Sequence, residues 1–102
     1  MDNEITVIEL KKRLDSGENL LVIDVREPYE YDEFNIGARL IPLGELPVEL
    51  HNLEDHLEEE IIVHCRSGAR SAAAQDYMRK QGFEKVRNLT GGILAWQQAF
   101  QN

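Results

Sequence analysis

Apolar residues of this chain gather in two short runs, 20–23 and 61–63, and recur in two short mixed segments, 39–41 and 86–89, which alternate with segments of helical spacing. Each run is too short to be a buried helix and is rich in residues that favour strands. Continuous rather than alternating apolar positions are typical of strands that are buried on both faces, as in a parallel sheet. We therefore predict strands at residues 20–23, 39–41, 61–64 and 86–89.

The segments before, between and after these runs carry the signals of helices. Thr6 and Glu9 have the spacing of a capping box, and Gly17 follows the end of that first helix. Pro47 interrupts the third segment, which is either one kinked helix or two short ones. The predicted helical segments cover residues 6–14, 29–34, 43–57, 71–81 and 93–100. Strands alternating with helices predict an α/β fold with a small parallel sheet flanked by helices on both faces.

The composition fits one domain over residues 1–102 and limits its partners. The chain has 102 residues, 42% of them hydrophobic, and a formal net charge of −8, which disfavours nucleic acid as a partner. The basic run 11–13 is more typical of the solvated face of a helix. No apolar run approaches a membrane span, and the acidic N-terminus lacks a secretory signal, so we expect no membrane partner and a cytoplasmic location. A single cysteine cannot form an internal disulfide and suits a reducing compartment.

Residues 61–71 carry the candidate chemistry, because an apolar strand brings Cys65 directly into a tight polar loop. A helix follows at once, so several backbone N–H groups and the positive end of that helix should converge on one point. If the anion held there is the sulfur of Cys65, its pKa falls and it becomes a nucleophile near neutral pH. This hypothesis requires amides that converge on the thiol and a thiol that solvent can reach.

Four motifs in this order resemble the single-domain rhodaneses, a class of sulfurtransferases. The motifs are Asp24-Val25-Arg26 with Glu30-Tyr31, Gly37-Ala38 with Ile41-Pro42, the loop Cys65 to Ser71, and Leu89 with Gly91-Gly92 and Trp96. Residues 34–38 depart from the family pattern, since they are one residue shorter and lack a histidine and a proline. The resemblance covers nearly the whole chain and implies the rhodanese-like fold.

The resemblance implies transfer of sulfane sulfur, from thiosulfate or a small or protein-bound persulfide to a thiol or cyanide, through a Cys65 persulfide. The alternative is a sulfur-relay or regulatory module that works with a larger partner and turns over little alone. Related cysteine phosphatases have five residues between cysteine and arginine, whereas only four separate Cys65 from Arg70. The shorter loop favours a single sulfur atom over a phosphate.

The candidate site residues fall into three groups. Cys65 is the predicted nucleophile, and the predicted donor-binding residues are Arg66, Ser67, Gly68, Ala69 and Arg70. Asp24, Arg26 and Ser71 are predicted to support the loop through hydrogen bonds. For Arg70, contact with the donor and a salt bridge that holds the loop are both open. His64 should point away from the thiol by strand alternation, and we expect neither a metal site nor a cofactor.

Overall fold

A five-stranded, all-parallel sheet in the order β1-β5-β4-β2-β3 forms the centre of the computed structural model, which describes residues 2–100. The strands are β1 Glu4–Ile5, β2 Leu21–Asp24, β3 Arg39–Leu40, β4 Glu60–His64 and β5 Lys85–Leu89. The four predicted strands are confirmed with shifts of one residue at their ends. The sequence analysis missed β1, because two residues are too few to form an apolar run. Its pairing with β5, Ile5 opposite Leu89, defines it.

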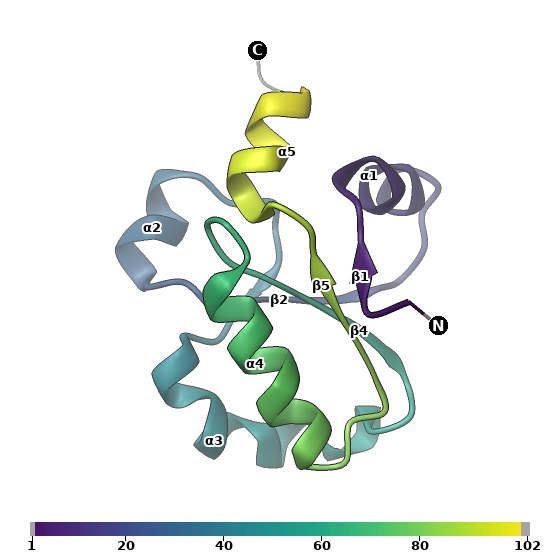
Figure 1. Cartoon of the computed structure of the whole chain (residues 1–102), viewed down its shortest axis with the longest axis vertical. Helices are drawn as coiled ribbons and strands as arrows, with labels where there is room; N and C mark the ends of the chain where they lie inside the picture. Colours follow the sequence, from purple (N-terminus) through teal and green to yellow (C-terminus); the bar gives the residue numbers. More distant parts are fainter. Residues whose placement is uncertain (1, 101–102) are drawn as a thin grey trace.

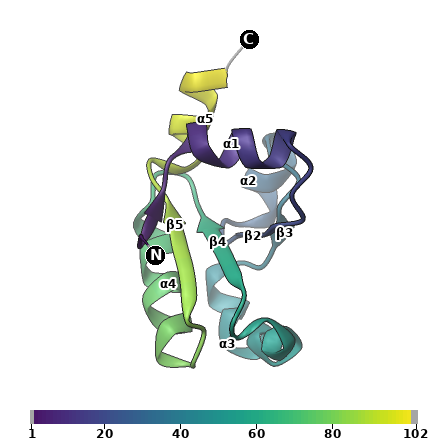
Figure 2. The same ribbon diagram turned by 90° about the vertical axis from the view of Figure 1, so that its right-hand side faces the viewer.

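Helices cover both faces of the sheet, as predicted. They are α1 Val7–Asp15, α2 Pro28–Glu33, α3 Leu46–Glu49, α4 Ala69–Lys80 and α5 Gly92–Phe100, with 3₁₀ turns at Leu43–Glu45 and Leu50–His56. In both views α1 and α5 lie together at one end of the molecule, away from α3 and α4 (Figures 1 and 2). The segment 43–57 is three short pieces, in place of the one or two expected helices. No helix among residues 2–100 is long and apolar enough to cross a membrane.

Alternation along β4 divides the core into two clusters. Ile61, Val63 and Cys65 pack on one face with residues of α4 such as Met78. Ile62 packs on the other face, in the cluster that contains Leu10 of α1 and Leu89 of β5. Because successive side chains of a strand point to opposite faces, the two clusters fix which way each residue after β4 can turn.

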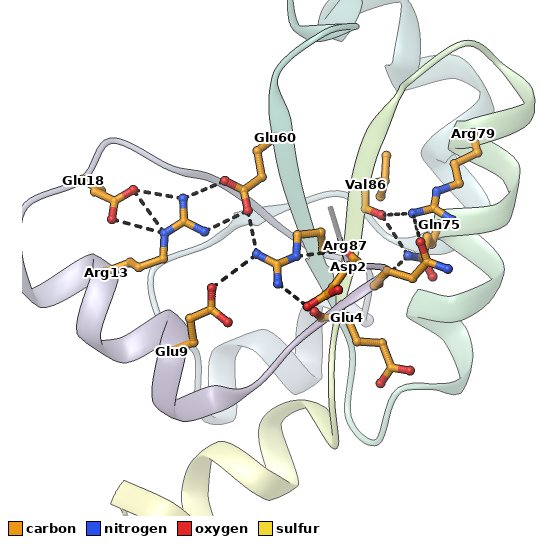
Figure 3. A network of polar contacts seen from close by, with 11 residues as sticks. Asp2, Glu4, Glu9, Arg13, Glu18, Glu60, Gln75, Arg79, Val86 and Arg87 are labelled. Atoms are coloured by element: carbon orange, nitrogen blue, oxygen red, sulfur yellow. Dashed lines mark hydrogen bonds and ion pairs between the residues drawn. The ribbon is translucent and has the colours of Figure 1, made fainter.

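A network of ion pairs ties α1 to the sheet at the start of β4 (Figure 3). Arg87 of β5 is 6% exposed and donates to the carbonyl oxygens of Asp2 and Glu4 and, at 2.9 Å, to a carboxylate oxygen of Glu60. Arg13 of α1 donates two hydrogen bonds to the same carboxylate. The hydrogen bonds from Arg13 outweigh burial and, with Arg87, lower the pKa of Glu60 to about 2.

Part of this network replaces the expected capping box at α1. The hydroxyl of Thr6 accepts a hydrogen bond from the Glu9 amide at 3.1 Å, as predicted. The Glu9 carboxylate instead lies 3.4 Å from a guanidinium nitrogen of Arg87. Arg87 lies in β5, far from α1 in the sequence. The local pattern therefore predicted the Thr6 contact correctly and the Glu9 contact wrongly.

We expect Glu60→Gln to lower the free energy of unfolding at pH 7 by about 1–2 kcal/mol, because it removes the charge that pairs Arg13 and Arg87. The pKa of Glu60 is lower in the folded state than its usual value of about 4.5. Its contribution to the free energy of unfolding is therefore complete above pH 4.5 and is lost as the pH falls toward 2. The difference between wild type and variant, measured by urea denaturation, should therefore shrink over that range. Glu58→Gln is the control, since Glu58 is exposed and its side chain has no polar partner among residues 2–100. An equal effect of both substitutions, or no dependence on pH, would contradict the prediction.

Candidate active site

The loop after β4 wraps its hydrogen-bond donors around the sulfur of Cys65. The amides of Gly68 and Ser71 donate to Cys65 Sγ at 3.1 and 3.3 Å, and the hydroxyl oxygen of Ser71 lies 3.3 Å from the sulfur. Gly68 has a φ of 117°, a conformation that favours glycine, and it caps α4. The helix begins at Ala69, two residues earlier than predicted, which brings the Ser71 amide into the first turn. Converging amides are therefore present, as the sequence analysis expected.

Cys65 itself is buried, with only 1% of its surface exposed. Burial raises the pKa of the Cys65 thiol. The Ser71 hydroxyl and the amides of Ser71, Gly68 and Ser67 lower this pKa by more, so that it lies below the ordinary value for cysteine. The expectation of a thiol that solvent can reach is not met in this structure, because Cys65 belongs to the packed cluster on the α4 face.

Ser71 and Asn88 form a support beneath the loop. The Ser71 hydroxyl donates to Asn88 Oδ1 at 2.6 Å, and the Asn88 side-chain amide donates to the carbonyl oxygen of Gly68 at 3.1 Å. Ser71 therefore makes hydrogen bonds of the kind expected of a residue that supports the loop. Asn88 was not predicted, because nothing in the strand pattern distinguishes an asparagine of β5 that faces the loop.

The first turn of α5 holds the loop from the other side. The amides of Ile93 and Leu94 donate to the carbonyl oxygens of Cys65 and Arg66, both at 3.0 Å. Gly92 has a φ of +55°, and a Cβ atom there would collide with the carbonyl oxygen of Cys65. The Gly91-Gly92 pair therefore does more than turn the chain, since it lets α5 approach the backbone of the loop.

Asp24 and Arg26 form a buried ion pair that serves α2 rather than the loop directly. Arg26 donates to both carboxylate oxygens of Asp24 at 2.7 to 3.0 Å. Its remaining donors reach the carbonyl oxygens of Glu30 and Phe34. Asp24 pairs in register with His64, one residue before the cysteine, so its side chain leaves the sheet on the opposite face. The prediction that these two residues support the loop through hydrogen bonds is therefore wrong, since their side-chain hydrogen-bond partners lie in residues 24–34.

Arg70 connects the loop to α2 through Glu30. Its two terminal nitrogens donate to the two carboxylate oxygens of Glu30 at 2.7 and 2.9 Å. The hydrogen bonds from Arg70 outweigh burial and lower the pKa of Glu30 to about 2. Of the two alternatives left open for Arg70, the structure contains the salt bridge. Glu30 was part of the recognised motif, but the sequence analysis did not predict its pairing.

The other predicted donor-binding residues line the outside of the loop. Arg66 and Ser67 are exposed, and neither side chain has a polar partner in the described part of the chain. Ala69 is exposed at the start of α4. A cavity of about 180 Å³ lies beside the loop, and its lining includes Arg66, Glu30 and Leu94. Arg66 is thus the cation of the loop that is free to meet a ligand.

His64 lies on the face away from the thiol, as predicted. It is fully buried, and neither ring nitrogen has a hydrogen-bond partner within residues 2–100. Burial lowers the pKa of His64, although the Asp24 carboxylate at 3.8 Å opposes this effect. Over the same residues no group of three or more histidine, cysteine, aspartate or glutamate side chains could hold a metal ion.

Comparisons with known proteins agree on one family. The model of the rhodanese-like domain matches residues 6–99. A sulfurtransferase of Allochromatium vinosum is 37% identical over 97 residues, which cover 94% of this chain and 89% of that protein. The adenylyltransferase and sulfurtransferase MOCS3-2 of Zea mays is 36% identical over 92% of this chain, but the match spans 21% of that protein. The human single-domain sulfurtransferase TSTD1 has a TM-score of 0.82 and 25% identity, with 99% of this chain and 100% of that chain covered.

We expect Ser71→Ala to move the pH midpoint of Cys65 alkylation upward, because the thiolate loses one of its donors. The rate of reaction with iodoacetamide at pH 7 should fall roughly three- to tenfold, as expected for one hydrogen bond to an anion. Ser67→Ala is the matched control, because it removes a hydroxyl of the same loop that has no hydrogen bond to the sulfur, and it keeps the Ser67 amide. If both variants shift the midpoint equally, the hydroxyl of Ser71 has no special contact with the thiolate.

Proposed function

Because the chain belongs to the rhodanese-like domain family, we propose that it transfers sulfane sulfur from thiosulfate or a persulfide through a persulfide on Cys65. Sulfur transfer in general is the activity named for its relatives. One observation carries the specific proposal, namely the convergence of the Gly68 and Ser71 amides on a sulfur whose pKa is lowered. Fixed donors around a buried anion stabilise it without reorganisation.

The proposed first step is attack by the Cys65 thiolate on the outer sulfur of the donor. With thiosulfate, a sulfur–sulfur bond forms to Cys65, the bond to the sulfonate sulfur breaks, and sulfite leaves with its electron pair. With a persulfide, the leaving group is the thiolate of the donor. A second nucleophile, a thiol or cyanide, then takes the outer sulfur and returns Cys65 to the thiolate. No external oxidant or reductant is needed.

Between the two steps the loop holds the Cys65 persulfide anion, which is longer than the thiolate by one sulfur atom. The donors that face Cys65 Sγ come from Gly68, Ser71 and, more weakly, Ser67. The Ser71 hydroxyl oxygen lies 2.6 Å from Asn88 Oδ1, 3.2 Å from the carbonyl oxygen of Gly68 and 3.3 Å from Cys65 Sγ, so its single proton can be donated to the sulfur when the thiol ionises. Since Cys65 is 1% exposed, the exposed segment at Arg66 and Ser67 must shift before a donor reaches the sulfur.

A second candidate is a relay module that loads sulfur and passes it to a larger partner. The maize relative favours it, because the matched region is a fifth of a protein that is named for an adenylyltransferase as well as a sulfurtransferase. The geometry of the loop is compatible with both roles. Steady-state turnover with thiosulfate and cyanide separates them, because a relay loads once and turns over poorly without its partner.

We expect wild-type protein incubated with a sulfane donor to gain the mass of one sulfur atom, and a thiol to remove it. Cys65→Ser should gain nothing and should lose all transfer of sulfur to cyanide, because the nucleophile is absent. Intact-protein mass spectrometry and thiocyanate formation measure the two effects. Circular dichroism is the control for folding of the variant. Transfer that survives in Cys65→Ser would reject covalent catalysis at this residue.

A further inference from the structure

The charged groups around the loop are almost completely paired inside the protein. Arg26 is bound by Asp24, and both are buried. Arg70 is bound by Glu30 through two hydrogen bonds, and the side chain of Glu30 is only 12% exposed. Among residues 2–100, Arg66 is the one arginine near the sulfur without a carboxylate partner. On a chain of net charge −8, this leaves little positive charge for an anionic ligand.

The guanidinium of Arg70 is the group best suited to bind a sulfonate, and the carboxylate of Glu30 already occupies it. A guanidinium binds planar or tetrahedral oxyanions through two parallel hydrogen bonds, and it uses the same two donors for a carboxylate. Arg70 directly precedes Ser71, whose amide donates to Cys65 Sγ at 3.3 Å, so its side chain starts from the same first turn of α4 as the donors to the sulfur. A donor with several anionic oxygens must therefore compete with Glu30 for Arg70.

We propose that Glu30 is a specificity-determining residue, which occupies Arg70 and so disfavours sulfonate-bearing donors such as thiosulfate relative to persulfides of uncharged thiols. This inference rests on the proposed function and names the donor class of the same site. A dianion approaches a thiolate, a carboxylate and a neutralised arginine, whereas a persulfide of an uncharged thiol has no oxyanion to place. The adjacent cavity offers Phe34, Ile93 and Leu94 for contact with an organic group, while its carboxylates, Glu30 and Glu33, repel a dianion and its free cation is Arg66.

Glu30 acts through Arg70, so its effect can be separated from a purely structural one. Gln at position 30 keeps an oxygen that can accept the Glu27 amide at the start of α2, which now bonds to Glu30 Oε1 at 2.9 Å. The Arg26–Asp24 pair still holds α2 through the carbonyl oxygens of Glu30 and Phe34. Loss of the negative charge alone should therefore free Arg70 while the helix stays in place.

The test measures single-turnover loading of Cys65 with two donors, thiosulfate and the persulfide of 2-mercaptoethanol. In Glu30→Gln the half-saturating concentration of thiosulfate should fall about five- to tenfold with little change in the maximal rate, because an arginine is released to bind the ground state. Loading by the persulfide should change by less than about twofold. Asp32→Asn is the matched control for net charge, since Asp32 is exposed on the same helix without a polar partner in the described chain.

The double variant Glu30→Gln with Arg70→Ala completes the test, because the gain with thiosulfate should disappear when Arg70 is removed. A gain that persists without Arg70, an equal gain in Asp32→Asn, or an unchanged ratio between the donors would each overturn the inference. These outcomes require that wild-type Cys65 loads with sulfur. Failure of both donors to load the wild type would instead reject the proposed function itself.

Discussion

The convergence of main-chain amides on one buried sulfur is the constraint on which the rest of this structure depends. A thiolate at 1% exposure is stable only if fixed donors replace water, and the Gly68 and Ser71 amides do so from the first turn of α4. That geometry needs the positive φ of Gly68. It also needs the loop to be held from outside, by Asn88 below and by the amides at the start of α5. The loop, β5 and the start of α5 are therefore all needed to place the hydrogen bonds from the Gly68 and Ser71 amides to the sulfur.

Most arginines near the sheet also have their charge neutralised inside the protein, by ion pairs with carboxylates. Glu60 joins Arg13 and Arg87 at one end of β4, while Asp24 and Glu30 neutralise Arg26 and Arg70 at the other. The first cluster fastens α1 to the sheet. The second positions α2 against the loop and at the same time leaves Arg70 paired with Glu30. The ion pairs that hold the structure and the proposed donor selection thus rest on the same arrangement of charges.

Much of the fold follows from local patterns, and the exceptions have physical causes. Apolar runs located β2 and β4, because burial on both faces leaves a signal in consecutive residues. The strand β1 leaves no such signal, and its two residues are defined by pairing with β5. Similarly, Thr6 capped α1 as predicted, while Glu9 turned to Arg87, a residue 78 positions away. Local sequence preferences therefore predict a contact correctly unless a side chain from a distant part of the chain offers a stronger interaction.

Residue type and spacing over a few positions were enough to identify the candidate nucleophile Cys65, the length of its loop and the family. Only the tertiary structure decided that Cys65 is covered, that Asn88 supports the loop, that Asp24 and Arg26 serve α2, and that Arg70 is paired with Glu30. Those outcomes depend on which donors and acceptors meet in space. Forty residues separate the last pair, and short-range patterns carry no information about contacts of that range.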